Sequence, residues 1–337
     1  MVLLTYGTRP EKIKIDPLIK EMIKFGIPFK TLFTGQHKNI VTNDSDYELD
    51  FIEYPNNRLD SIIKNCMSIP ESYFDGIKYI LVQGDTTSVV GLSLSAMHRK
   101  IKIIHLEAGL RSYDINNPYP EEYNRKLVSS IANIHLCPTE KNKENLLKEN
   151  IEEKKIFVVG NTGLDHLYDY KEKISYQNKI LITLHRRENH EIMEKWFYEI
   201  NKLSLRHKDL EFILPIHPNP NVQKHKKILT NINVIEPLKH EELIDILINC
   251  KLVITDSGGI QEESSFLKKK CLVCRTSTER TESLGINTFL VKDPSNLIEL
   301  FDYHLYRYNE INGECPYGNG KSSEKICEII QRLLINN

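Results

Sequence analysis

The chain has 337 residues, with 45 basic and 46 acidic side chains and a net charge of −1. At about 150 residues per domain, this length predicts two domains, each large enough for its own core. The balanced charge excludes a global field that would attract nucleic acid or an anionic membrane, so any anion must be bound locally. No apolar run approaches the roughly 20 residues that span a bilayer, and "MVLLTYG" is too short for a signal peptide, so the cytoplasm is the expected compartment.

Short apolar runs alternate with longer segments of helical period. Before residue 170 the runs are 2–6, 29–34, 79–83, 101–106, 134–138 and 156–160. Beyond it they are 179–184, 211–216, 233–237, 252–256 and 271–275. Runs of about 4–6 apolar residues, each followed by a turn and a helix, are typical of parallel strands buried on both faces. The expected fold class is therefore α/β, with two doubly wound Rossmann-like domains.

The charged stretch 168–178, "YDYKEKISYQN", lacks strong periodicity and is the predicted linker. We therefore expect an N-terminal domain over residues 1–168 and a C-terminal domain over 175–320. The last segment, 321–337, has apolar positions at helical spacing after a plausible serine cap. This helix could cross back to pack on the N-terminal domain.

Seven cysteines, an odd number, are spread over the chain and do not form a small disulfide framework. Cys271 and Cys274 make one CxxC, but a second pair at zinc spacing is missing. Reduced thiols in the core and on the surface are therefore favoured over a redox or metal role, and no metal site is predicted.

Polar residues gather where the predicted strands end, which is where ligands bind in open α/β sheets. In the first half, the residues at or just after strand ends are Arg9, Lys14, Asp85, Glu107 and, in the loop that follows, Glu121. The second half carries His185, Arg186, His217, the stretch 256–263 and Arg280. Each has an ordinary structural alternative: Asp85 could cap its helix, and Glu107 could face solvent. Their concentration at successive strand ends favours one site, in a cleft between the two halves.

The stretch "ITDSGGIQEESSF", residues 254–266, predicts an anion site. A glycine pair at a helix start leaves backbone N–H groups uncovered, so Ser257, Gly258 and Gly259 suit a pyrophosphate. Glu263 could accept hydrogen bonds from a ribose diol; alternatively, Glu262 and Glu263 lie in the first turn and merely compensate the helix dipole. The spacing is neither GxGxxG nor a Walker loop, which disfavours hydride transfer and ATP hydrolysis, and no cofactor is predicted.

The motifs "GTRPEKIK", "GDTTS", "EAGLRSYDINNPYPEEYNR", "GNTGLD", "HRREN", "TDSGGIQEE" and "TER" together resemble the non-hydrolysing UDP-N-acetylglucosamine 2-epimerases of bacterial surface-polysaccharide synthesis. They run in order from residue 7 to about 282. The resemblance implies a GT-B arrangement of the two domains, a homodimer, a UDP-binding C-terminal domain and closure around a UDP-sugar.

The resemblance also implies roles for the polar residues. Asp85, Glu107 and Glu121 match the catalytic carboxylates, and Arg9, Lys14 and His185 match residues that meet phosphate and sugar, with His185 counted in the catalytic set. Ser257, Gly258 and Gly259 match the diphosphate seat, with Glu263 on the ribose and Arg280 also in the substrate site. Some members bind a second UDP-N-acetylglucosamine as an activator, and Gln36, Arg186 and His217 match residues used there.

Three departures from the family pattern leave alternatives open. The segment after Gln36 is shorter and more polar than usual, Tyr119 stands where Trp is usual, and "TERTES" replaces "TERPE". A related UDP-N-acetylated sugar, a hydrolysing 2-epimerase that releases N-acetylmannosamine, and a GT-B glycosyltransferase are the alternative enzymes. A catalytically silent sensor is disfavoured by the full carboxylate set.

The chemistry expected is elimination and re-addition of UDP. The C2 proton of an N-acetylhexosamine has no adjoining carbonyl, but loss of the diphosphate gives C1 oxocarbenium character and makes that proton removable. A glycal results, to which UDP returns while a proton is delivered to the opposite face of C2. This route needs an anion seat and proton-transfer groups on two faces of the sugar.

Overall fold

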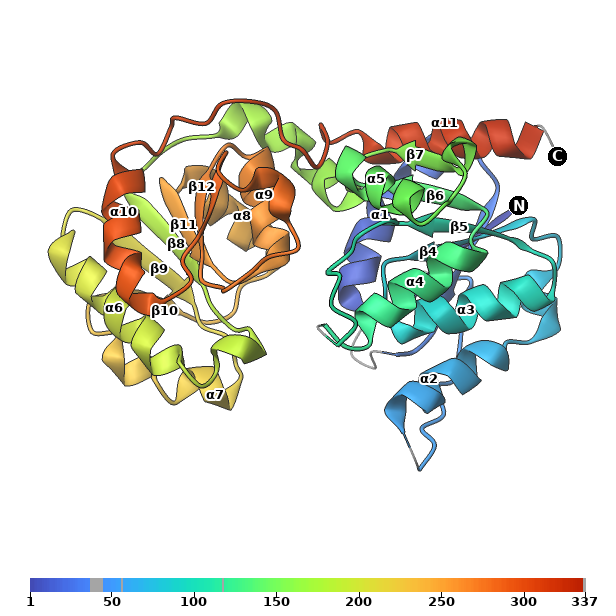
Figure 1. Ribbon diagram of the computed structural model, residues 1–337, viewed down its shortest axis with the longest axis horizontal. Helices are drawn as coiled ribbons and strands as arrows, with labels where there is room; N and C mark the ends of the chain where they lie inside the picture. The colour runs from blue at the N-terminus through green and yellow to red at the C-terminus, as the bar shows by residue number, and fades with distance from the viewer. Residues whose placement is uncertain (37–44, 56, 117, 336–337) are drawn as a thin grey trace. The chain divides into compact units, whose positions relative to one another are not determined.

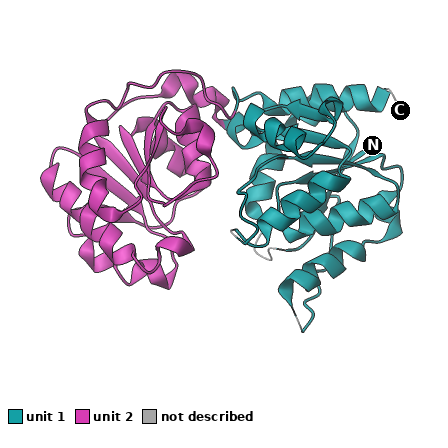
Figure 2. Cartoon of the chain, viewed as in Figure 1, with its two compact units in different colours: residues 1–166, 318–337 teal, residues 167–317 magenta. Residues whose placement is uncertain are grey.

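The computed structural model describes residues 1–36, 45–55, 57–116 and 118–335. The chain forms two compact units, coloured separately in Figure 2. Unit 1 comprises residues 1–166 and 318–337, and unit 2 comprises residues 167–317. Within the described ranges, no helix is long and apolar enough to cross a membrane.

Unit 1 contains a seven-stranded sheet in the order β3-β2-β1-β4-β5-β6-β7. All of its paired strands are parallel. Its strands are β1 (Val2–Tyr6), β2 (Phe29–Phe33), β3 (Tyr47–Glu48), β4 (Tyr79–Gln83), β5 (Lys102–Leu106), β6 (Ile134–Cys137) and β7 (Ile156–Val158). The order runs outward in both directions from the β1–β4 pair, which makes the sheet doubly wound.

Helices cover both faces of this sheet (Figure 1). They are α1 (Arg9–Lys24), α2 (Arg58–Met67), α3 (Thr87–His98), α4 (Glu121–Ile131), α5 (Glu140–Lys148) and α11 (Ser322–Ile335), with 3-10 turns η1 (Glu71–Phe74) and η2 (Glu153–Lys155). Successive β1 side chains point to opposite faces. Val2 and Leu4 therefore share a core with α1 and α11, whereas Leu3 shares one with α2 and α3.

The C-terminal helix α11 returns to unit 1, where it packs against α1 and β4 (Figure 1). Its apolar face, with Ile326, Cys327 and Ile330, is fully buried. A serine cap was expected at its start. Instead, the carboxylate of Asp165 accepts from the backbone N–H groups of Ser322 and Ser323, at 2.9 and 2.6 Å. An acidic side chain from a distant segment thus satisfies the first N–H groups of this helix.

Unit 2 contains a six-stranded parallel sheet in the order β10-β9-β8-β11-β12-β13. Its strands are β8 (Lys179–Thr183), β9 (Glu211–Pro215), β10 (Asn233–Ile235), β11 (Leu252–Thr255), β12 (Lys270–Val273) and β13 (Thr288–Leu290). Its helices are α6 (Met193–Arg206), α7 (Pro220–Gln223), α8 (His240–Asn249), α9 (Gly258–Phe266) and α10 (Leu297–Leu305), with 3-10 turns η4 (Arg187–Asn189), η5 (Lys226–Ile228), η6 (Thr281–Ser283) and η7 (Pro294–Asn296).

The core of unit 2 joins α6 and α10 to one face of this sheet. Trp196 and Phe197 from α6 and Phe301 from α10 are almost completely buried there, and the ring of Phe301 stacks on that of Phe212 at 5.8 Å. Helices α8 and α9 lie on the other face (Figure 1). The sheet is thereby covered on both sides, as expected for strands that are apolar throughout.

Ten of the eleven predicted apolar runs contain an observed strand, and the run 271–275 overlaps β12, which begins one residue earlier. The two strands without a prediction, β3 and β13, have 2 and 3 residues and lie at the edges of their sheets. Part of the stretch predicted as a linker continues a 3-10 helix, η3, over Thr162–Lys173. Cys271 and Cys274 are fully buried, and burial raises the pKa of both thiols, which agrees with core cysteines.

Candidate active site

The turn from β1 to α1 is held by a buried carboxylate, that of Glu11. This side chain accepts from the N–H groups of Gly7 and Thr8, at 2.5 and 2.9 Å, and from the hydroxyl of Thr86 at 2.6 Å. Burial raises the pKa of Glu11, although these hydrogen bonds oppose the shift. A Cβ at Gly7 would lie 2.2 Å from the Thr34 hydroxyl, so only glycine fits there. The turn leaves Arg9 exposed at the first residue of α1.

Asp85 follows β4 and does not cap the next helix. The cap position of α3 is Thr86, and no side-chain hydrogen bond caps this helix. Instead Asp85 pairs with Arg125 from α4, whose Nε and Nη2 lie 2.9 and 2.7 Å from Oδ2. The same guanidinium lies 2.9 Å from the buried carboxylate of Glu122. Burial lowers the pKa of Arg125, but the two carboxylates more than offset this and raise it overall.

Glu107 follows β5 directly and has an unusual backbone. Its φ is +66°, a left-handed conformation that is uncommon for residues other than glycine and is concentrated at functional sites. Its carboxylate is only partly exposed and lies 2.5 Å from the Nζ of Lys14, so it is not a solvated strand-end charge. The side-chain amide of Gln83, at the end of β4, also donates to it.

Glu121 is the first residue of α4. Its Oε2 is buried and has no hydrogen-bond partner among the residues that the structure describes. One turn further along α4, the amide of Asn124 donates to the backbone carbonyl of Asp85 at 2.8 Å, beside the Arg125 pair. These contacts fasten the first turns of α4 to the end of β4.

The three predicted carboxylates of unit 1 therefore lie near the carboxyl ends of neighbouring strands of one sheet. The ends of β4 and β5 are neighbours because these strands pair in register up to Gln83 and Leu106. A Cβ at Gly84 would lie 3.7 Å from the carboxylate of Glu107. Two ion pairs, Lys14–Glu107 and Arg125–Asp85, thus lie at the ends of these neighbouring strands.

In unit 2, His185 is positioned by Asp256. The fully buried carboxylate of Asp256 accepts from the N–H groups of His185 and Arg186, at 3.0 and 2.9 Å, and from the Asn189 amide at 2.9 Å. Burial lowers the pKa of His185, and the nearby Asp256 opposes that shift. The imidazole of His185 stacks on that of His217, with ring centroids 5.2 Å apart.

The predicted diphosphate seat is the start of helix α9. Ser257 is its cap residue, and Gly258 and Gly259 are its first two residues. The guanidinium of Arg280 lies over Gly258: a Cβ added to this glycine would lie 3.0 Å from the Arg280 Cζ. Arg280 also pairs with Glu262 at 3.0 Å and with Glu279. The helix start and this cation together can hold an anion of two phosphates.

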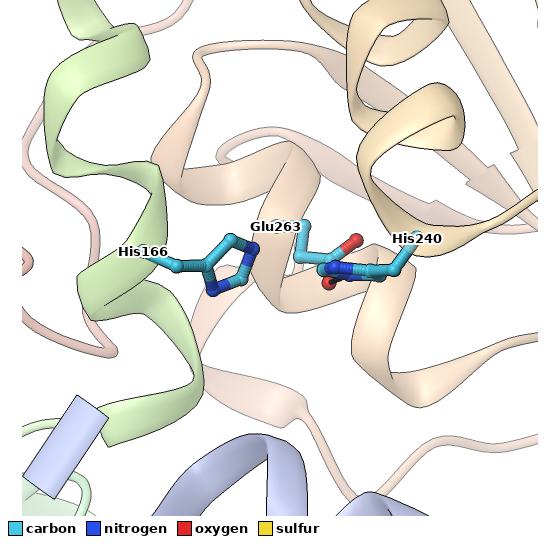
Figure 3. A group of neighbouring side chains, drawn as sticks. All are labelled: His166, His240 and Glu263. Carbon is cyan, nitrogen blue, oxygen red and sulfur yellow. Dashed lines mark hydrogen bonds and ion pairs between the residues drawn. The ribbon is translucent and has the colours of Figure 1, made fainter. Parts of the chain in front are cut away.

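The prediction that Glu262 and Glu263 lie in the first turn of this helix was wrong. Helix α9 begins at Gly258 and its first turn holds no acidic residue, so neither glutamate lies where dipole compensation acts. Glu263 instead accepts from the Nε2 of His240 at 2.8 Å. Figure 3 shows this pair, with the imidazole of His240 at the start of α8 beside the carboxylate of Glu263 on α9. The third side chain drawn, His166, is the last residue of the segment 1–166 of unit 1.

The residues matched to an activator site are described in part. In unit 1, the Ser88 hydroxyl donates to the side chain of Gln36 at 2.6 Å. In unit 2, Arg186 is partly exposed and His217 is exposed. Most of the segment that departs from the family pattern after Gln36, residues 37–44, lies outside the described residues.

The sequence analysis did not single out Glu11, Arg125, Asp256 or His240. The first three stand inside the quoted motifs, so a signal was present, but their side chains act on backbone and on other side chains. His240 stands in "EPLKHEEL", just after β10, a strand end that the analysis passed over.

Comparisons with known proteins show the family of this chain. The model of the family described as UDP-N-acetylglucosamine 2-epimerase matches residues 26–331. A UDP-N-acetylglucosamine 2-epimerase of Campylobacter jejuni is 36% identical, over 98% of this chain and 97% of the relative. The crystal structure of the Neisseria meningitidis enzyme bound to UDP-GlcNAc is 36% identical, with a TM-score of 0.86, over 98% of this chain and 99% of the other. That of the Methanocaldococcus jannaschii enzyme, in complex with UDP-GlcNAc and UDP, is 31% identical with a TM-score of 0.78, over 98% and 99%.

Two Rossmann-like units, one with carboxylates at the carboxyl ends of its strands and one with a glycine-opened helix start beside Arg280, are those of a nucleotide-sugar enzyme. The predicted fold class is confirmed by these structures, and the predicted class of enzyme, an isomerase, is confirmed by the relatives. The chain belongs to the UDP-N-acetylglucosamine 2-epimerase family.

Proposed function

We propose that this protein interconverts UDP-N-acetylglucosamine and UDP-N-acetylmannosamine by eliminating and re-adding UDP. The observation that carries the proposal is the set of three carboxylates in unit 1, each in a different environment. Asp85 is paired with Arg125, Glu107 with Lys14, and Glu121 has a buried Oε2 without a partner in the described part of the chain. A protein that only bound a nucleotide would need the anion seat but not this set.

The reaction needs a proton removed from C2 and another delivered to the opposite face. The C1–O bond to the diphosphate breaks with both electrons leaving on UDP, and a carboxylate takes the C2 proton, so that a C1–C2 double bond forms. In the return step UDP adds to C1 as C2 gains a proton on its other face. We assign the two proton transfers to Asp85, Glu107 and Glu121. Such groups each contribute about 10²–10⁴ in rate.

Unit 2 would stabilise the departing UDP. We assign the diphosphate to the N–H groups of Ser257, Gly258 and Gly259, with Arg280 and His185 beside it and Glu263 on the ribose. Arg9 and Lys14 of unit 1 would add cations for phosphate and sugar. Stabilisation of the developing charge by such preorganised donors is usually the largest catalytic contribution.

The test is incubation with UDP-N-acetylglucosamine in D₂O, followed by proton and phosphorus NMR. The expected result is deuterium at C2 in both epimers with no steady accumulation of UDP. Accumulating UDP with free N-acetylmannosamine would show a hydrolysing enzyme instead. Because Tyr119 and "TERTES" depart from the family pattern, related UDP-N-acetylated sugars belong in the same panel. No exchange with any of them would refute epimerisation.

Two substitutions separate catalysis from binding. Asp85→Asn should lower turnover by at least about 100-fold and leave UDP binding nearly intact, because the carboxylate serves proton transfer. Arg9→Ala should weaken UDP binding, which calorimetry measures directly. Equal turnover of Asp85→Asn and the unmodified enzyme would remove this carboxylate from the mechanism.

We also propose an activator, a homodimer and a cytoplasmic location. The activator would be a second UDP-N-acetylglucosamine at Gln36, Arg186 and His217, tested by sigmoidal kinetics. The exposed Tyr123 and Leu127, four residues apart on α4, support the dimer, which sedimentation would detect. The seven free cysteines suit a reducing compartment.

A further inference from the structure

We propose that His240 is a positioning residue for ribose recognition: it holds one oxygen of Glu263 so that the other meets a ribose hydroxyl. The inference rests on the proposed function, in which unit 2 binds UDP, and it adds a residue that the family motifs did not indicate.

His240 and Glu263 meet because of the topology of unit 2. His240 is the first residue of α8, which follows β10, and Glu263 lies on α9, which follows β11. Both strands belong to the same parallel sheet, so both helices begin at the same edge. The N–H of Lys239 donates to the side chain of Glu242 at 2.7 Å, which fixes the start of α8 and therefore the backbone of His240.

The two oxygens of Glu263 have different environments. Oε1 accepts from the Nε2 of His240 at 2.8 Å. Oε2 is buried and has no hydrogen-bond partner within the described ranges. A buried carboxylate oxygen without a partner is costly, and such atoms in native proteins call for an explanation. A hydroxyl donor from a ligand is that explanation.

The hydrogen bond from His240 to one carboxylate oxygen of Glu263 also restricts the position of the other oxygen. A free glutamate side chain on a helix has several rotamers, and ordering them on binding costs affinity. The short, rigid imidazole restrains the carboxylate before the ligand arrives, and the side chains of both residues are mostly buried. His240 therefore acts on the ribose through Glu263, without touching the nucleotide.

The ligand test compares UDP with 2′-deoxy-UDP and 3′-deoxy-UDP by calorimetry. The unmodified protein should bind UDP about tenfold or more tightly than the analogue that lacks the hydroxyl bonded to Oε2. Glu263→Gln should abolish most of this preference. His240→Phe keeps a ring but loses the donor, so it should reduce the preference at least about threefold, by weakening the binding of UDP but not that of the analogue that lacks this hydroxyl. His240→Gln keeps a donor and should retain the preference.

Kinetics give a second readout. With the UDP-sugar as substrate, His240→Phe should raise KM and change kcat little, because ground-state and transition-state binding of the ribose are lost together. His240→Gln should keep KM near that of the unmodified enzyme.

The outcomes separate the inference from the proposed function. Equal weakening of UDP and both analogues in His240→Phe would mean a merely structural role and overturn the inference. So would an unchanged preference in His240→Phe when Glu263→Gln has lost it. Tight UDP binding without any preference for the hydroxyls would remove Glu263 from ribose recognition and the inference with it, leaving the UDP site intact. Failure to bind UDP at all would overturn both.

Discussion

Acid should destabilise unit 1 through two adjacent buried histidines, His105 on β5 and His135 on β6. They are partners in the register of these parallel strands, and their side chains are almost completely buried. The Nε2 of His105 donates to the carbonyl of Gly84 at 2.8 Å, next to Asp85. Burial lowers the pKa of His105 to about 4 and that of His135 to about 3, from an ordinary 6.5.

The direction of the change in the free energy of unfolding follows from which state, folded or unfolded, binds the protons. Between pH 6.5 and about 4 the unfolded chain binds protons at both positions and the folded chain does not, so the free energy of unfolding falls as the pH falls. At pH 5 each histidine accounts for a loss of about 2 kcal/mol relative to its value above pH 7.5. The pair thus removes about 4 kcal/mol, a large part of the roughly 5–15 kcal/mol that stabilises a domain.

Urea unfolding at pH 7.5 and pH 5 measures this loss. The only tryptophan, Trp196, lies in unit 2, so fluorescence follows unit 2, and a circular-dichroism transition that fluorescence does not show belongs to unit 1. His135→Leu removes one titrating group at similar volume and should halve the acid loss in unit 1. An identical loss in the variant and the unmodified protein would refute the reasoning.

Three further predictions concern Glu107, the two glycines at the start of α9, and Lys269. Glu107→Gln should lower turnover at least about 100-fold while calorimetry still detects UDP binding; turnover within tenfold of the unmodified enzyme would exclude a proton-transfer role. Gly259→Ala should raise thermal stability by up to about 1 kcal/mol, because the new Cβ meets nothing closer than a hydroxyl at 4.0 Å. Gly258→Ala should not, because its Cβ would lie 3.0 Å from the Arg280 guanidinium; equal melting temperatures would contradict this contact. Burial lowers the pKa of Lys269 to about 8 from an ordinary 10.5. Between these pH values the unfolded chain binds a proton that the folded chain does not, so the free energy of unfolding of unit 2 should rise by up to about 3 kcal/mol as the pH rises. Tryptophan fluorescence measures this rise, which Lys269→Met should lack.

Local patterns were sufficient for the main strands and for the strand ends at which the candidate site residues lie. An apolar run followed by a turn and a helix places the next polar residues at the carboxyl end of a parallel strand, whatever the rest of the chain does. Asp85, Glu107 and the start of α9 were located in this way. The same reasoning misplaced Glu262 and Glu263 in the first turn of α9, because a helix boundary is set by cap geometry that spacing alone does not show.

The partners of these residues came only from the tertiary structure. Arg125 reaches Asp85 across 40 positions, and the backbone of His185 reaches Asp256 across 71. Such contacts depend on which strands are neighbours and on rotamers chosen by packing, and neither leaves a periodic trace in the sequence. The sequence by itself determined the α/β class, the order of the strands along the chain and the residue types available for chemistry. Which carboxylate is paired, which oxygen is left without a partner and which histidine faces Glu263 were decided by the three-dimensional packing, because charges and hydrogen bonds act over a few ångströms in space.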